Sequence, residues 1–422
     1  MSEQRRSSKE PGHAETNEQA RESRALAPGT AGSSYFRPRF SCWRRRDVGC
    51  FLLLLLSGIA TLLILAPTTP GVRSSSAISS ASTSASPQAP TAASTVPLSA
   101  PIFHEYPFPR SNGQAMRLAM DHKGRLWFGM MGQNTLMWLD PSTHAFGQVA
   151  VPQGRAGIMG IQVAAGETIW FVEQFANYLG HYLPATRTFR LYPLPFLAVP
   201  DPNAPGKTLR EPSAPNDLML DAQGNLWFTE FQAGMIGRLD PSTGQFRHYA
   251  LSGSPGKAQN LAPYGLTIDA QGMIWFTEMS GHHIGRLDPH TGAIRFYALP
   301  APDIEPMEIA SDREGNLWIT TFDAGLLLDL DPRTGHVTRY QASLTSTDAG
   351  GLYGLAIASN DDVWVTILAQ NALARLDHTT HRFLYYRVPT ANSSPLALIT
   401  GPHQTFWFSE TQQLGELTFG GT

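Results

Sequence analysis

Cysteine is almost missing from this sequence. Only Cys42 and Cys50 occur among its 422 residues, and both precede the region in which the sequence repeats. A disulfide framework and a cysteine-based metal site are therefore excluded for that region. The 3.6-residue apolar periodicity of a helical solenoid is also absent, so the repeats are not expected to be helical.

Several functional signatures are lacking as well. The sequence has no Gly-rich phosphate loop, no Gly-x-Ser-x-Gly elbow and no His-Glu-x-x-His motif. Charged residues make up only 15% of the chain. Residues 1–47 carry ten Lys or Arg and six acids, while the whole chain has a formal net charge of -3. The remainder is therefore acidic, which argues against nucleic acid as a partner.

The sequence is rich instead in turn-forming and apolar residues. It contains 38 Gly and 32 Pro, and 42% of its residues are hydrophobic. This composition is typical of many short strands joined by tight turns around a substantial core.

The first hundred residues divide into three segments. Residues 1–47 are polar and aperiodic, which predicts a disordered tail. Residues 48–66 are uncharged and mostly apolar, close to the roughly 20 residues that a helix needs to cross a bilayer. A cleaved signal peptide is the alternative. Residues 67–100 are nearly all Ser, Ala, Thr and Pro, which predicts a flexible linker.

The arginines at 44–46 stand immediately before the apolar run, and no comparable basic cluster follows it. By the positive-inside rule, the N-terminus is expected in the cytoplasm. The sequence therefore predicts a single-pass cell-membrane protein whose residues 101–422 lie outside.

From residue 101 onward the sequence repeats, and one tryptophan marks each repeat. The spacings between successive tryptophans run from 43 to 57 residues, which is the period of a propeller blade. The seven marks are Trp127, Trp170, Trp227, Trp275, Trp318, Trp364 and Trp407.

Each repeat is expected to hold four strands, a to d. In the clearest repeat these are residues 263–268, 274–278, 284–287 and 294–299, separated by Gly-containing turns. The seventh repeat stops after its third strand, and the d-strand signature Tyr-x-Phe-Pro occurs instead at residues 106–109. We therefore predict an all-β fold, a seven-bladed β-propeller whose N-terminal strand completes the last blade and removes its exposed edge.

An insertion interrupts the repeat between the second and third blades. Residues 196–212 contain four prolines and are predicted to form a long loop. Such a loop either carries function or is a tolerated surface insertion.

The up-and-down path of the strands brings the ends of strand b and the starts of strand a to one face of the ring. Carboxylates converging there would offer oxygen ligands to Mg²⁺ or Ca²⁺. The alternative is that each caps backbone N–H groups or pairs with Arg238 or Arg286 of its repeat. The candidate metal ligands are Glu173, Glu230, Glu278 and Glu410.

Other polar residues on the same face fall outside the repeated phrase. Glu305 and Glu308 are therefore the candidate catalytic residues, as acid and base. Two adjacent histidines at 282 and 283 are a weaker candidate for metal binding. The predicted ligand-binding rim comprises Arg117, Asn216, Asp217, Tyr264, His282 and Tyr353.

The repeated unit Trp-Phe-Thr-Glu, Ile-Gly-Arg-Leu and Tyr-x-Leu-Pro, preceded by Pro-Tyr-Gly-Leu-Thr, closely resembles the virginiamycin B lyases, or streptogramin lyases. The resemblance covers about residues 101–422. It implies a seven-bladed propeller that opens cyclic streptogramin B antibiotics by elimination at an ester bond, with Mg²⁺ and a histidine base.

The family's functional histidines and glutamates correspond to positions in the last two repeats of this sequence. The resemblance places its first histidine at Tyr353 and its general base at Leu396. The family's Glu before that base corresponds to Ser394, and its Glu at the end of the seventh b strand falls roughly one position from Glu410. The triplet Glu305-Pro306-Met307 looks like the family's Glu-Pro-His, but it stands in the fifth repeat.

Two functions remain open from the sequence. The first is a membrane-tethered, monomeric propeller that binds a small molecule, peptide or glycan at the channel mouth. The second is a metal-dependent C–O lyase, or a hydrolase of the gluconolactonase-like type, that uses the rim carboxylates. Fold alone does not choose between them.

Overall fold

The computed structural model describes residues 100–109, 113–153, 155, 157–201, 204, 206–251, 261–301, 304–342 and 351–420. The predicted tail, apolar run and all but the last residue of the linker lie outside these residues. Within the part described, no helix is long and apolar enough to span a membrane.

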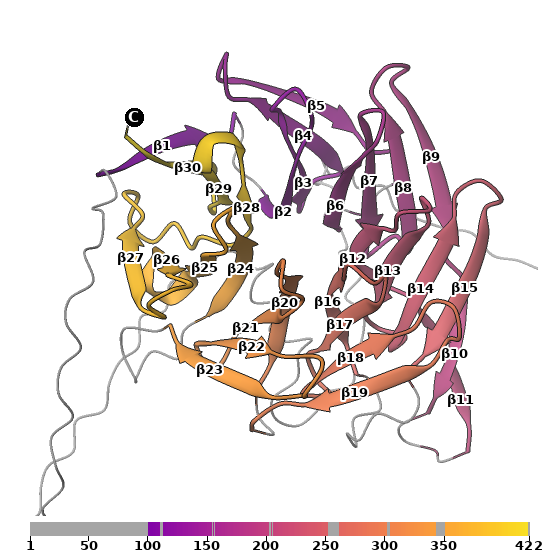
Figure 1. Ribbon diagram of the computed structural model, residues 1–422. Coiled ribbons are helices and arrows are strands. Elements are labelled where there is room, and N and C mark those ends of the chain that lie inside the picture. Colours follow the sequence, from indigo (N-terminus) through magenta and orange to yellow (C-terminus); the bar gives the residue numbers. More distant parts are fainter. Residues whose placement is uncertain are drawn as a thin grey trace, which may run out of the picture. The chain divides into compact units, whose positions relative to one another are not determined.

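Seven four-stranded antiparallel sheets surround a common axis, as predicted (Figure 1). Strand a of each blade lies nearest the axis. The a strands are β2 (Gln114–Met120), β6 (Ile158–Ala164), β12 (Pro215–Leu220), β16 (Pro263–Ile268), β20 (Pro306–Ser311), β24 (Leu352–Ile357) and β28 (Leu398–Thr400). The b strands are β3 (Leu126–Met131), β7 (Thr168–Glu173), β13 (Leu226–Glu230), β17 (Ile274–Glu278), β21 (Leu317–Thr321), β25 (Val363–Ile367) and β29 (Phe406–Ser409).

The outer two strands complete each blade. The c strands are β4 (Thr135–Asp140), β8 (Tyr178–Leu183), β14 (Met235–Asp240), β18 (His283–Leu287), β22 (Leu326–Leu330), β26 (Ala372–Leu376) and β30 (Gln413–Phe419). The d strands are β5 (Ala145–Ala150), β9 (Thr188–Pro193), β15 (Gln245–Ala250), β19 (Ile294–Ala298), β23 (Val337–Gln341), β27 (Phe383–Arg387) and β1 (Pro101–Pro107). Two single 3₁₀ turns lie at Leu368–Gln370 and Pro402–Gln404.

Strand β1 closes the ring. It pairs antiparallel with β30, with Pro101 opposite Phe419 and Pro107 opposite Gln413, and Figure 1 shows the indigo strand beside the yellow one. The predicted closure is therefore confirmed. Because β30 runs toward the a–b and c–d turns, β1 enters the ring at that end, which we call the turn end. The opposite end, where the a strands begin, is the a-start end.

The Trp-Phe pair of strand b joins neighbouring blades. Successive side chains of a strand point to opposite faces, so Trp275 packs against the next blade, beside Ile309 and Leu317. Phe276 packs against the previous blade, beside Trp227. Burial of a tryptophan removes about 150–250 Å² from water, which explains why one tryptophan recurs in every unit.

The inserted segment differs from the prediction. Within this segment, β10 (Phe196–Pro200) and β11 (Thr208–Pro212) pair as two antiparallel strands, where a loop was predicted. The prolines at 200 and 212 stand at the ends of the two strands, where the missing N–H group disturbs the ladder least.

Candidate functional site

Each of the first six a strands carries an irregularity at the same point of its pairing with strand b. In β16, for example, Pro263 pairs with Glu278 and Leu266 with Phe276, so Tyr264 and Gly265 together form a bulge. A bulge re-aims the side chains of its residues. The second bulge residue alternates around the ring between charged residues and glycine: Arg117, Gly160, Asp217, Gly265, Glu308 and Gly354.

The glycines allow neighbouring a strands to approach closely. A Cβ atom on Gly265 would lie 2.5 Å from the carbonyl oxygen of Met307 and 3.1 Å from the Cα of Glu308. Both distances are shorter than normal contacts, so any side chain at this position would force the two strands apart. Space at the axis is thereby left to the charged residues of the alternate blades.

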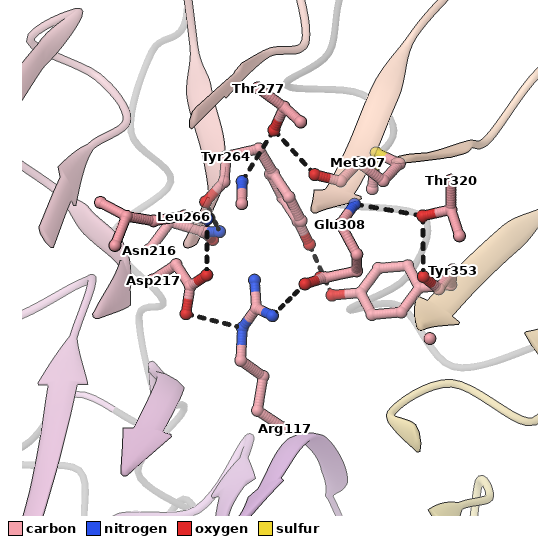
Figure 2. A network of polar contacts seen from close by, with 12 residues as sticks. Arg117, Asn216, Asp217, Tyr264, Leu266, Thr277, Met307, Glu308, Thr320 and Tyr353 are labelled. Atoms are coloured by element: carbon pink, nitrogen blue, oxygen red, sulfur yellow. Dashed lines mark hydrogen bonds and ion pairs between the residues drawn. The ribbon is translucent and has the colours of Figure 1, made fainter. Parts of the chain in front are cut away.

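Five side chains from five blades meet at the axis and form what we call the axial cluster: Arg117, Asp217, Tyr264, Glu308 and Tyr353 (Figure 2). The Arg117 Nε lies 3.2 Å from the Asp217 Oδ1, and its Nη1 contacts the Glu308 Oε2. The hydroxyls of Tyr264 and Tyr353 share a hydrogen bond of 2.6 Å. The Tyr264 ring lies beside the guanidinium, with its centroid 6.0 Å from the Arg117 Cζ.

Asp217 is held rigidly within this cluster. Its Oδ1 accepts the backbone N–H of Leu218 at 2.8 Å, and its Oδ2 accepts that of Leu266 in the next blade at 2.9 Å. Both carboxylate oxygens therefore have backbone partners before Arg117 is counted. Asp217 fixes the guanidinium, whereas Glu308 has a free oxygen.

Burial changes the electrostatics of the cluster. Burial raises the pKa of Glu308 to about 7 against the lowering effect of Arg117, and Asp217 adds to the rise. Burial would lower the pKa of Arg117, but the two carboxylates raise it above its ordinary value. Burial also raises the pKa of Tyr264 and of Tyr353, so both hydroxyls stay protonated.

Two polar atoms of the ion pair have no hydrogen-bond partner although they are buried: the Nη2 of Arg117 and the Oε1 of Glu308. Buried polar groups are almost always paired, so this donor and this acceptor remain available to a group from outside the cluster.

The threonine of the repeated Trp-Phe-Thr-Glu phrase supports the bulges. Thr277 accepts the N–H of Gly265 at 2.9 Å and donates to the carbonyl of Met307 in the next blade at 2.7 Å. Figure 2 shows this threonine and its counterpart Thr320, which joins Glu308 to Tyr353 in the same way. We call the set the hydroxyl relay; its members are Thr229, Thr277, Thr320 and Thr366.

The predicted rim is partly assembled by the structure. Arg117, Asp217, Tyr264 and Tyr353 come together in the axial cluster. Asn216 lies beside them: its Nδ2 donates to the carbonyl of Tyr264 at 3.2 Å, and its Oδ1 accepts from Gln174 at 3.4 Å.

His282 takes a different role from the other rim residues. Its Nδ1 donates to the carbonyl of Ile304 at 2.8 Å, and the Nδ1 of His283 donates to the carbonyl of Gly281. Of the two candidate catalytic residues, Glu308 is the one whose carboxylate meets Arg117. Glu305 precedes β20, where its N–H donates to Asp323 at 3.0 Å.

The four repeated glutamates do not fit a shared metal ion. All four are fully buried in separate blades. Glu173 accepts three backbone N–H groups, Glu230 pairs with His248 at 2.9 Å, and Glu410 accepts from Gln413 at 3.1 Å. Among the described residues, no three His, Cys, Asp or Glu are grouped so that they could hold a metal.

The axial cluster does not fit a divalent ion either, because the guanidinium of Arg117 already lies between Asp217 and Glu308. We therefore assign no chemical step to Mg²⁺ or Ca²⁺. The alternative partners Arg238 and Arg286 lie instead over the rings of Trp227 and Trp275, at 5.8 Å and 5.6 Å.

The positions that the resemblance gives to catalytic histidines hold Tyr353 and Leu396, and Leu396 is fully buried. A leucine cannot take up a proton, so Leu396 supplies no base. Tyr353 is itself a member of the axial cluster, and the other four members lie at the equivalent bulges of other blades. Neither the bulges nor the hydroxyl relay is predicted from the sequence; the signal for the relay is the threonine that recurs in the repeated phrase.

A hollow of about 350 Å³ opens near the turn end of blades 5 to 7, beside Ser311, Arg313 and Thr400. Its ion pair, Arg313 with Asp361, is long at 3.8 Å, and the arginine is largely exposed. This hollow was not predicted from the sequence, and its polar groups are held far less firmly than those of the axial cluster.

Solved structures with the same fold include a streptogramin B lyase, which is 25% identical over 76% of this chain and 98% of its own, with a TM-score of 0.65. The virginiamycin B lyase of Staphylococcus aureus is 21% identical over 76% of this chain and all of its own, also with a TM-score of 0.65. A search of curated proteins finds no significant match.

A third similar structure is the extracellular domain of a protein assigned to the hybrid two-component systems of B. thetaiotaomicron. It is 19% identical over 73% of this chain and 40% of its own, with a TM-score of 0.55. The family model for virginiamycin B lyases matches residues 207–422, just over half of the 422 residues. The chain therefore belongs to the virginiamycin B lyase family.

Proposed function

We propose that this protein is a membrane-anchored, extracytoplasmic binding module. Residues 48–66 span the membrane, the N-terminus lies in the cytoplasm, and the linker at 67–100 carries the propeller outside. The propeller acts as a monomer and binds a small molecule, peptide or glycan at the a-start end through the axial cluster.

The observation that carries this proposal is the convergence of five side chains from five blades on one polar cluster with an unpaired donor and an unpaired acceptor. A cluster that served only to hold the blades together would gain from pairing every atom, because each unpaired buried group costs about 1–3 kcal/mol. Unpaired groups at the axis are what a site awaiting a ligand would show.

A thermal-shift screen of the full chain in detergent tests the binding proposal. We expect at least one compound to raise the Tm of the wild type and to lose this effect in Arg117→Met. The matched control Arg313→Met changes an exposed arginine at the turn end and should respond as the wild type does. Hits that stabilise Arg117→Met equally would place the binding elsewhere and refute the proposal.

The membrane topology has a separate test, because the chain has only two cysteines. A Ser75→Cys variant in a Cys42→Ser, Cys50→Ser background should react with a membrane-impermeant maleimide on intact cells. A variant that retains only Cys42 should react only after the cells are opened. Equal labelling of Cys42 on intact cells would contradict a cytoplasmic N-terminus.

A second candidate is a lyase or hydrolase in which Glu308 acts as the base. Its carboxylate is buried, its pKa is raised to about 7, and Arg117 beside it would stabilise a developing oxyanion. Liquid chromatography with tandem mass spectrometry of a streptogramin B incubated with the protein would detect either reaction. Elimination gives a linear product of unchanged mass with different fragments, and hydrolysis gives a product heavier by one water. Turnover that Glu308→Gln abolishes would favour the enzyme over the binding module.

A further inference from the structure

The ion pair of the axial cluster is joined by fewer bonds than its groups can make. An arginine and a carboxylate often form two parallel hydrogen bonds, but here a single contact links the Nη1 of Arg117 to the Oε2 of Glu308. The Nη2 and the Oε1 remain unpaired on the same pair of residues. A ligand that reaches both atoms would meet one donor and one acceptor.

The charges of the cluster do not balance. Arg117 faces both Asp217 and Glu308, so the cluster has a net charge of -1 when both carboxylates are ionised. The other two members, Tyr264 and Tyr353, are protonated phenols. A ligand that brings one positive charge to Glu308 would neutralise the cluster, and the nearby tyrosine rings are surfaces that attract cations.

The Asp217 carboxylate is less suited to receive that charge. Both of its oxygens already accept backbone N–H groups, and Oδ1 also faces the Nε of Arg117. The free acceptor is therefore on Glu308, and the free donor is on Arg117.

From these observations we infer that the site takes a primary ammonium group with a carbonyl oxygen on the neighbouring carbon, as in the N-terminal residue of a peptide or an amino-acid amide. The ammonium binds the Oε1 of Glu308, and the carbonyl oxygen accepts from the Nη2 of Arg117. This inference rests on the proposed binding function and names its ligand class.

Other ligand classes fit less well. A carboxylate ligand would find its donor in Arg117 but would bring a second negative charge next to Glu308. A neutral amide would satisfy both unpaired atoms and leave the net charge of -1. A single water could also bridge the two atoms, and the experiment must separate this case from binding.

The test uses isothermal titration of the full chain in detergent at pH 8 with L-alaninamide, N-acetyl-L-alaninamide and L-alanine. We expect L-alaninamide to bind more tightly than the acetylated probe by about 10–100-fold, the value of a hydrogen bond between charged groups. L-Alanine, whose carboxylate replaces the carbonyl, should be weaker than the amide. Equal affinities for all three probes would overturn the ligand class.

Glu308→Gln keeps the shape of the side chain and removes its charge, and we expect it to lower the affinity for L-alaninamide by at least 10-fold. Glu105→Gln is the matched control, because Glu105 lies in β1, where it accepts from Thr390, and should leave binding unchanged. Unaltered binding to Glu308→Gln would refute the assignment.

A measurement on the wild type covers the case in which Glu308→Gln fails to fold. Near pH 7, an ammonium bound beside Glu308 should favour its ionised form and release a proton. Titrations of L-alaninamide in two buffers of different ionisation heat would then give different enthalpies. Equal enthalpies would contradict the contact, and no detectable heat in either buffer would contradict binding of the ammonium.

The screen described above separates the two proposals. A different compound whose binding depends on Arg117 would overturn the ammonium class and leave the binding function intact. If no compound depends on Arg117, both proposals fall.

Discussion

Blades 3–7 and blades 1–2 follow the same four-stranded plan but join their neighbours differently. In blades 3–6 a threonine of strand b links its own bulge to the next blade, and Ser409 of blade 7 accepts the N–H of Ala397. In blades 1 and 2 the equivalent residues are Gly129 and Val172. A Cβ on Gly129 would lie 2.0 Å from the Ile158 side chain, so apolar packing replaces the hydroxyl there.

This difference coincides with the range that the family model matches, residues 207–422. The region that matches the family thus carries the relay, and the region outside it does not. Yet blade 1 supplies Arg117, the only cation of the axial cluster. The repeated phrase thus maintains the ring, whereas the charges of the site come from Arg117, Asp217 and Glu308, which replace the bulge glycine of blades 2, 4 and 6.

The largest loss of stability is expected from a change of Arg117, which links blade 1 to blades 3 and 5. Arg117→Met leaves Asp217 and Glu308 buried without a cation, which should lower the free energy of unfolding by about 3–5 kcal/mol. Urea denaturation would measure the loss. The triple variant Arg117→Met, Asp217→Asn, Glu308→Gln should recover most of it; a triple variant as unstable as the single one would mean that packing, not charge, is responsible.

The free energy of unfolding should also depend on pH in opposite directions in the two regions. The contribution from blades 5 and 7 should fall as pH rises, and the contribution from blade 1 should fall as pH drops. Burial raises the pKa of Glu308 and of Glu410 to about 7. The folded protein therefore binds these protons more tightly than the unfolded chain, and their stabilising effect is lost as pH rises from about 4.5 through 7. Each pKa shift is worth up to about 3 kcal/mol.

In blade 1, burial opposes a lower pKa for Asp121, but hydrogen bonds from Trp127 and Arg125 lower it below its ordinary value. Its contribution is present above pH 4 and is lost in acid. The free energy of unfolding should be measured from pH 3 to 8. Glu308→Gln should make it depend less on pH near neutrality, and Asp121→Asn should make it depend less on pH in acid. If Glu308→Gln leaves the slope between pH 5 and 7 unchanged, the raised pKa is wrong.

Exchanging threonine and valine at the relay position of blades 4 and 2 would test whether the relay hydroxyl stabilises only one of the two regions. Thr277→Val leaves the N–H of Gly265 and the carbonyl of Met307 without their partner, which should cost about 1–3 kcal/mol. The reverse change in blade 2, Val172→Thr, adds a hydroxyl where the repeat provides the same two backbone groups. Hydrogen bonds to those groups should offset its burial, so the loss of stability should stay below about 1 kcal/mol. Denaturation midpoints of both variants would decide; equal costs would mean that the relay is not specific to blades 3–7.

The smallest effect concerns the residue opposite the tryptophan. Arg286 stacks over Trp275 in blade 4, whereas in blade 2 His181 stacks on Trp170 with ring centroids 4.0 Å apart. Burial lowers the pKa of His181 to about 4, so this ring is neutral and offers no cation.

Arg286→His should therefore lower the free energy of unfolding by about 0.5–1 kcal/mol, and His181→Arg should raise it by about 0.5 kcal/mol. The strand partner of each position is an arginine, Arg295 or Arg190, so the two sites are comparable. A thermal melt at low and high salt would detect the change. A destabilising His181→Arg would show that stacking in blade 2 depends on ring shape rather than charge.

Much of the fold could be predicted from the sequence because the blade unit is repeated seven times along the chain. The tryptophan spacing gave the blades, and the strand limits in the clearest repeat agree with the structure to within one residue. The closure by β1 followed from a missing strand. The paired strands β10 and β11 were predicted as a loop, because a proline-rich stretch outside the repeat offers no period to compare.

The site was less accessible to such reasoning. Arg117, Asp217 and Glu308 stand at equivalent points of three a strands, so comparison of the repeats could align them. Their meeting at the axis depends on the bulges and on the space that the glycines of intervening blades leave. Neither of these is visible in a pattern that assumes regular strands.

The closure of the ring by β1 has a mechanical consequence. If residues 48–66 anchor the chain, any pull on the propeller is transmitted through the linker to Pro101, the first residue of the closing strand. Since Pro101 enters at the turn end and pairs there with Phe419, tension would act first on the pairing at that end of β1 and β30. With that anchor, the strand that closes the ring would also be the strand that carries the load, so the pairing of β1 with β30 would be the first part of the ring to open.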